Sequence, residues 1–160
     1  MRTCVVAIAV LLLSHASAGG EDRAIISTGS DNSGRRTLVG TVDDYNGKEL
    51  KLQLASGQAI AVPSERVIEL TSAWNADHQQ ADLLAGQRKY EAAITAYIRA
   101  NKGETRHWAR RRILASVVTC YENLGQIDRA GDTFVLLMKA DDHWQYFERI
   151  PLAWLSGVAV

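Results

Sequence analysis

Two pairs of side chains in this sequence have the residue types and spacing of metal ligands. His78 and Asp82 are four residues apart, so a helix would place them on one face, and Glu104 and His107 form a second pair. An imidazole and a carboxylate can share a zinc ion, but a zinc site needs three or four protein ligands, and no Cys/His spacing of a zinc module is present. Neighbouring polar residues on a helix surface account better for both pairs, so no metal site is predicted.

Signatures of other catalytic chemistry are missing from the sequence. It contains no nucleophile elbow, phosphate-binding loop or Ser/His/Asp pattern, and its glycines fall at turns. Arg110-Arg111-Arg112 is the one dense basic run, and on a helix the three side chains spread over roughly 200°. Because 18 acidic residues balance 18 basic ones, a solvated face is favoured over a nucleic-acid site. We predict no enzyme, no catalytic residue, no cofactor and no nucleic-acid partner.

Two similar helical segments would position these side chains. In residues 89–97 Tyr97 follows Ala93 by four places, and in residues 126–134 Phe134 follows Ala130 in the same way. The alanines are 37 residues apart, and each small side chain would let two helices cross closely. Apolar periodicity predicts helices over about 73–86, 90–100, 105–124 and 127–139, with Ser72 capping the first.

This pattern resembles the tetratricopeptide repeat family over roughly residues 74–140. The resemblance implies two repeats and a non-catalytic binding scaffold, in which the first helix of each repeat supplies the ligand-facing side chains. It also places Arg88 where the family frequently has glycine. Taken by register from Ala93 and Ala130, the implied protein- or peptide-binding groove is lined by Asn75, His78, Asp82, Arg112, Thr119, Glu122 and Asn123. A solvated helix face is the alternative interpretation of the same residues.

Residues 37–71 have an apolar period of two. Leu50, Leu52 and Leu54 alternate with polar residues, which is typical of a strand with one buried face. Asn46-Gly47 predicts a tight hairpin with positive φ at both turn residues. Strand number and spacing make this segment similar to a small SH3-like or Sm-like barrel. Residues 19–36 are expected to be a polar leader, with an edge strand around Ile25 as the alternative.

The N-terminal segment predicts export. Arg2, an apolar run from Val5 to Leu13 and small residues at Ala16-Ser17-Ala18 indicate a signal peptide over residues 1–18, cleaved before Gly19. The mature chain would be periplasmic, in the cell envelope or extracellular, and it would contain no transmembrane segment. Cleavage leaves Cys120 as the single thiol, and its apolar helical setting predicts a small buried residue.

The sequence as a whole therefore predicts an α+β protein: a β-module at 37–71, two helical repeats at 72–140, and a capping helix and tail at 141–160. The capping helix would begin at Asp141 or Asp142 and contain Trp144, Phe147 and Ile150. The expected function is that of an exported interaction scaffold. The alternative is a structural subunit or fragment of a larger envelope assembly, including an oligomer, with the aromatic and apolar C-terminal end as its contact surface.

Overall fold

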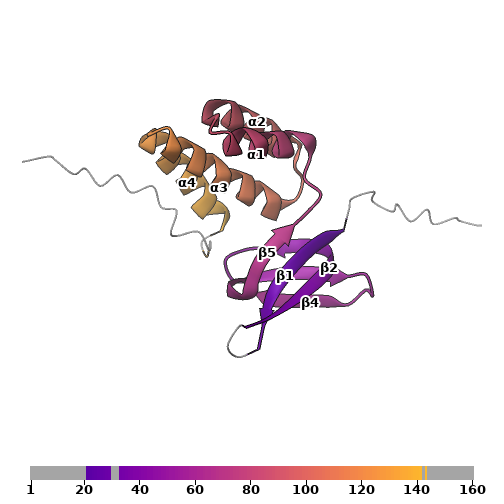
Figure 1. Cartoon of the computed structure of the whole chain (residues 1–160). Coiled ribbons are helices and arrows are strands. Elements are labelled where there is room, and N and C mark those ends of the chain that lie inside the picture. The colour runs from indigo at the N-terminus through magenta and orange to yellow at the C-terminus, as the bar shows by residue number, and fades with distance from the viewer. Residues whose placement is uncertain (1–20, 30–32, 142, 144–160) are drawn as a thin grey trace, which may run out of the picture.

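The computed structural model describes residues 21–29, 33–141 and 143, and it has an α+β fold in which a five-stranded antiparallel sheet is followed by four helices (Figure 1). The predicted signal peptide lies outside the described residues. So does the predicted capping helix and tail, apart from Asp141 and His143.

The sheet has the strand order β4-β3-β2-β1-β5. Its strands are β1 (Asp22–Thr28), β2 (Gly34–Tyr45), β3 (Glu49–Leu54), β4 (Ala59–Pro63) and β5 (Val67–Thr71), with a 3-10 turn at Ser64–Arg66. The leucine alternation is confirmed, because Leu50 and Leu52 are fully buried. The expected polar leader is wrong here, because Asp22–Thr28 form a strand. The alternative of a strand around Ile25 is confirmed, but not its expected place at the edge of the sheet. β1 lies between β2 and β5 because β5 returns along its free side, and the sheet therefore begins at Asp22 instead of residue 37.

The hairpin between β2 and β3 forms where Asn46-Gly47 predicts it, but by a different mechanism. Neither Asn46 nor Gly47 has a positive φ. Instead the Asn46 side-chain oxygen accepts hydrogen bonds from the backbone N–H groups of Lys48 and Glu49, at 2.9 and 3.0 Å. The asparagine thus turns the chain with its side chain.

The four helices are α1 (Ala76–Gly86), α2 (Tyr90–Gly103), α3 (His107–Asn123) and α4 (Ile127–Ala140). Each packs against the next helix in the chain. Asn75, not Ser72, caps α1, because its side chain accepts from the His78 N–H at 2.8 Å. Within the described residues, no helix is long and apolar enough to cross a membrane.

The two helical pairs share local features at a 37-residue spacing. Ala93 in α2 and Ala130 in α4 are both fully buried, as expected at close helix crossings. Arg88 precedes α2 with a φ of 60°, and Gly125 precedes α4 with a φ of 69°. Both residues therefore adopt the left-handed conformation that glycine accommodates without steric cost.

Arg88→Gly is expected to stabilise the protein by about 1 kcal/mol, because a non-glycine residue in the left-handed region carries a steric cost of about 1–2 kcal/mol. Urea unfolding measures the change. The matched control is Gly125→Arg, which introduces the same cost at the equivalent position and should destabilise the protein. An Arg88→Gly variant less stable than the wild type would contradict the argument.

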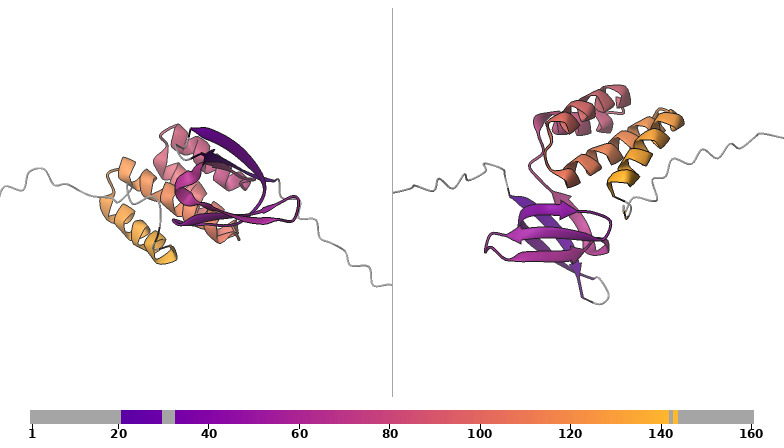
Figure 2. Two further views of the ribbon diagram at one scale, coloured as in Figure 1. Left: turned by 90° about the horizontal axis from the view of Figure 1, so that it is seen from below. Right: turned by 180° about the vertical axis from the view of Figure 1, so that it is seen from behind.

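One end of the sheet meets the beginning of α3 (Figures 1 and 2). Trp108 and Ala109 belong to the sheet's hydrophobic core, together with Leu38, Leu52 and Leu70. A second core lies among α1, α2 and α3 and includes Cys120, which is buried as predicted. The sheet and the helices therefore share α3 as a common support.

Candidate functional site

The implied groove residues of the first helical pair, Asn75, His78 and Asp82, lie in α1 or directly before it. The Asn75 side chain makes two hydrogen bonds within the fold. Besides capping α1, its side-chain amide donates to the Ala100 carbonyl at 3.3 Å. This contact connects the start of α1 to α2. The prediction of Asn75 as a ligand-facing side chain is therefore replaced by a structural role at the helix N-terminus.

His78 is a core residue and not a ligand-facing one, which corrects the expectation from sequence. Only 1% of it is exposed, and its ring lies 4.4 Å from the Trp74 ring and 5.8 Å from the Tyr97 ring between centroids. Its Nε2 is 3.7 Å from Asp82 Oδ1, and its Nδ1 has no hydrogen-bond partner among the described residues. Burial lowers the pKa of His78 below its ordinary 6.5 and outweighs the opposing effect of the Asp82 carboxylate. The imidazole is therefore neutral at pH 7.

This buried imidazole makes stability depend on pH. Between the lowered folded-state pKa and 6.5 the unfolded chain binds a proton that the folded chain does not, so the free energy of unfolding should fall as pH decreases below about 6.5. We expect His78→Gln to reduce this dependence, measured by urea unfolding from about pH 7 to about pH 5. His107→Gln, at an exposed residue of α3, is the control. An unchanged pH dependence in His78→Gln would contradict the assignment.

Asp82 of α1 and the buried Tyr97 of α2 form a polar contact beside α3. The solvent-facing side around it, which carries Trp74, Asp82, Arg112, Thr119 and Asn123, is here termed the α1–α3 face. The Tyr97 hydroxyl donates to Asp82 Oδ1 at 2.6 Å and is also hydrogen-bonded to Ser116 of α3. Burial, reinforced by the Asp82 carboxylate, raises the pKa of Tyr97. The Asp82 side chain remains 52% exposed, so its carboxylate faces solvent beside this cluster. It can accept a hydrogen bond from a ligand N–H group.

Cys120 lies close to the same cluster but is not activated as a nucleophile. Burial, together with the Asp82 carboxylate, raises the pKa of its thiol to about 11. The thiol is therefore protonated at neutral pH, whereas a reactive cysteine needs its thiolate.

Trp74 is a prominent residue of this region that the sequence did not single out. Its ring has the guanidinium groups of Arg112 at 5.1 Å and Arg106 at 5.5 Å, and it meets the Trp108 ring edge-on at 5.5 Å. Arg112 also donates to the Leu70 carbonyl at 3.3 Å. Arg112 is thus held against a half-buried tryptophan, an arrangement that provides an apolar ring and a charge side by side. The sequence holds no signal for this role, because Trp74 falls within the helix that periodicity predicts over about 73–86.

The remaining implied groove residues lie farther along α3. Thr119 and Asn123 follow Arg112 by seven and eleven positions, which a helix places on the same face. The Thr119 hydroxyl donates to Ala115, and the Asn123 amide donates to the Thr119 carbonyl. Glu122 is about 100° around the helix from Asn123, so it lies beside this face and not on it. The structure therefore brings His78, Asp82 and Arg112 together and places Thr119 and Asn123 in line with them.

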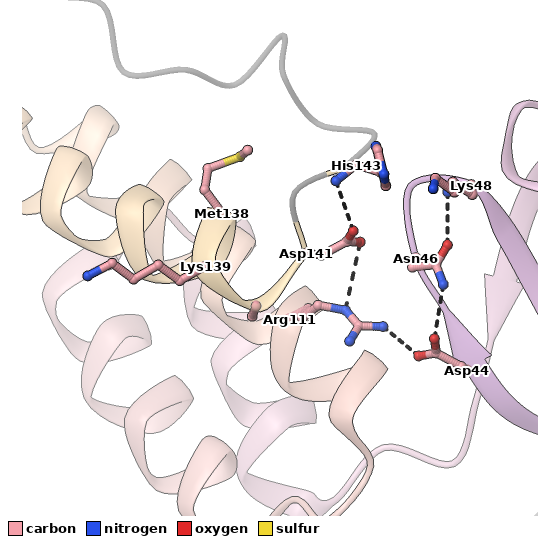
Figure 3. Close-up of a pocket in the computed structure, with 9 residues that line it drawn as sticks. Asp44, Asn46, Lys48, Arg111, Met138, Lys139, Asp141 and His143 are labelled. Carbon is pink, nitrogen blue, oxygen red and sulfur yellow. Dashed lines mark hydrogen bonds and ion pairs between the residues drawn. The ribbon is translucent and has the colours of Figure 1, made fainter.

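A second polar cluster connects the sheet to the helices (Figure 3). Arg111 of α3 is 10% exposed and donates to Asp44 Oδ1 of β2 at 2.5 Å, and its Nε is 4.0 Å from Asp141 Oδ2 at the end of α4. Asp141 in turn accepts from the Gly47 N–H at 2.9 Å. Burial alone would raise the pKa of Asp44, but hydrogen bonds from Arg111 and Asn46 outweigh it and lower the pKa. Arg111 is therefore a buried link, not part of a solvated face.

An open cavity of about 580 Å³ lies beside this link, lined by residues of both signs that include Lys48, Lys139 and His143. Because two carboxylates already neutralise Arg111, the cluster is best explained as a connection between β2, α3 and α4. Among residues 21–29, 33–141 and 143, no three His, Cys, Asp or Glu side chains come together as a metal site.

Comparisons with protein-family models, curated proteins and solved structures gave no match to this chain.

Proposed function

We propose that this protein is an exported, non-catalytic scaffold that binds a peptide segment of another protein on its α1–α3 face. The observation that carries the proposal is that a half-exposed Asp82 carboxylate and the Trp74 ring, on which Arg112 lies, both flank the buried His78 ring. A peptide offers N–H donors for the carboxylate and apolar side chains for the tryptophan ring. Thr119 and Asn123 extend the same polar face along α3.

Internal similarity supports a tetratricopeptide-like organisation of the helices. The buried alanines Ala93 and Ala130, and the left-handed residues Arg88 and Gly125, recur at one spacing of 37 residues. In such an organisation the first helix of each pair contributes to the binding face. Here those helices are α1 and α3, the two that carry the proposed contacts.

We propose that the sheet is curved as in a small SH3-like barrel and that it supports the helices. The 12-residue β2 pairs with both β1 and β3, and the 3-10 turn at Ser64–Arg66 directs the chain from β4 to β5. Export rests on the signal-like residues 1–18. It can be tested by expressing the full chain with Ala18→Leu: cleavage before Gly19 should be lost, and an uncleaved wild type would contradict export by this route.

Panning a random dodecapeptide phage library on the mature protein tests the binding proposal. Enriched peptides should shift the NMR amide signals of Asp82, Arg112 and Asn123. Asn123→Arg, at an exposed position on this face, should weaken binding at least about tenfold, a loss of about 1.4 kcal/mol. Asp132→Arg, an exposed polar position on α4, is the matched control and should leave affinity unchanged. No enrichment, or shifts confined to other surfaces, would contradict the proposal.

A further inference from the structure

One side of α4 exposes apolar residues that no described element covers. Ile127 and Phe134 are half-buried, and Val135 is 51% exposed. With Gly131 between them, these residues fall at helical spacing and form one apolar line, here termed the α4 stripe. α3 packs on the adjacent side of α4, where Ala130 and Leu137 are almost fully buried.

The equivalent side of α2 is buried against a neighbouring helix. By analogy, the α4 stripe is suited to packing against another element. Ile94 and Tyr97 stand 37 residues before Gly131 and Phe134, and they are only 7% and 3% exposed. Their burial depends on α3, which contributes Ile113 to the same core. α2 thus has helices on two sides, whereas α3 is the only described helix that packs closely on α4.

We propose that residues 144–160 of the same chain cover the α4 stripe. This segment follows the end of α4 at Ala140 by three residues, which is a normal length for a connection between neighbouring helices. It contains Trp144, Phe147 and Ile150 at three-residue intervals, a spacing that puts three large apolar side chains on one side of a helical turn. The charge on the segment is low, since Glu148 and Arg149 are its only charged residues.

The start of the connection is held in place. Asp141 Oδ2 accepts from the Gly47 N–H at 2.9 Å, and Asp141 Oδ1 accepts from the His143 N–H at 3.1 Å. A segment that turns back here runs antiparallel to α4 and passes Phe134 before it reaches Ile127. The proposal concerns a surface separate from the α1–α3 face and does not depend on peptide binding there.

A cysteine pair tests the proposal in the full mature chain. Val135→Cys with Phe147→Cys should form an intramolecular disulfide under mild oxidation, because a disulfide requires Cα atoms within about 7 Å. Leu136→Cys with Phe147→Cys is the matched control. Leu136 is 56% exposed but points about 100° away from Val135, so its pair should react at least about tenfold more slowly. Buried Cys120 remains in both variants.

Non-reducing electrophoresis and mass spectrometry distinguish the outcomes. A fast intramolecular link in the Val135 pair alone supports the proposal. Disulfide-linked dimers would overturn it in favour of a second copy on the stripe, and equal rates in the two pairs would overturn it outright. Hydrogen exchange provides a second measurement: Phe147→Ser should speed exchange at the Phe134 and Val135 amides several-fold. The control, Leu83→Ser on α1, should leave exchange at these amides unchanged. Unchanged exchange in Phe147→Ser would also count against the proposal.

Discussion

Arg111→Met is expected to destabilise the protein by about 3–5 kcal/mol, the usual cost of removing one partner from a buried ion pair. The arginine side chain is 10% exposed and lies between Asp44 and Asp141, so its loss leaves two carboxylates without their cation. Methionine retains most of the aliphatic stem, which separates the effect of charge from that of packing. Urea unfolding at pH 7 measures the change.

The neighbouring arginine provides the control for this prediction. Arg110 is exposed, and its contact with Asn101 is long at 3.4 Å, so Arg110→Met should change stability by no more than about 0.5 kcal/mol. Adding Asp44→Asn to Arg111→Met should recover part of the loss, because it removes one uncompensated charge. If both arginine variants were equally stable, Arg111 would not link the sheet to the helices.

Trp108→Ala is expected to cost about 3–5 kcal/mol as well, here through lost packing. Trp108 is 2% exposed in the core of the sheet, and its ring also supports Trp74 on the α1–α3 face. The substitution should therefore weaken peptide binding together with stability. Urea unfolding measures the stability, and fluorescence titration with an enriched peptide measures the binding.

Trp108→Phe separates volume from hydrogen bonding at the same position. Within the part of the chain that the structure describes, the indole N–H of Trp108 has no hydrogen-bond partner, so phenylalanine removes ring volume without breaking a hydrogen bond seen there. We expect a loss below half of that for Trp108→Ala. Leu83→Ala, at a residue 62% exposed on α1, should be nearly neutral. A neutral Trp108→Ala would contradict the shared core between α3 and the sheet.

Much of the fold could be predicted from local patterns. The leucine alternation at 50, 52 and 54 predicts β3, and the apolar periodicity predicts all four helices to within three residues at each end. The residues that stabilise the turns and helix starts were harder to predict from the sequence. Asn46 turns the chain through its side chain, and Asn75 replaces Ser72 as the helix cap, because several nearby polar residues compete for each such role.

The residues of the candidate site were likewise predicted only in part from the sequence. Register placed Asp82 and Arg112 on one face, and the structure brings both to the region around Trp74. It could not show that His78 is buried, because a polar residue on a helix face is covered or exposed according to what packs over it. Trp74 was missed for the converse reason, since it lies outside any helix and gains its role from two distant arginines.

The sequence by itself determined the class of every described element except β1, together with the 37-residue recurrence, because periodicity and turn chemistry act over a few neighbouring residues. Only the tertiary structure decided which member of Arg110-Arg111-Arg112 is buried, which strand lies between β2 and β5, and which helix side is left uncovered. Each of these depends on contacts between residues far apart in the chain. The physical reason is that burial is a property of the whole packing, whereas helix and strand periods are encoded locally.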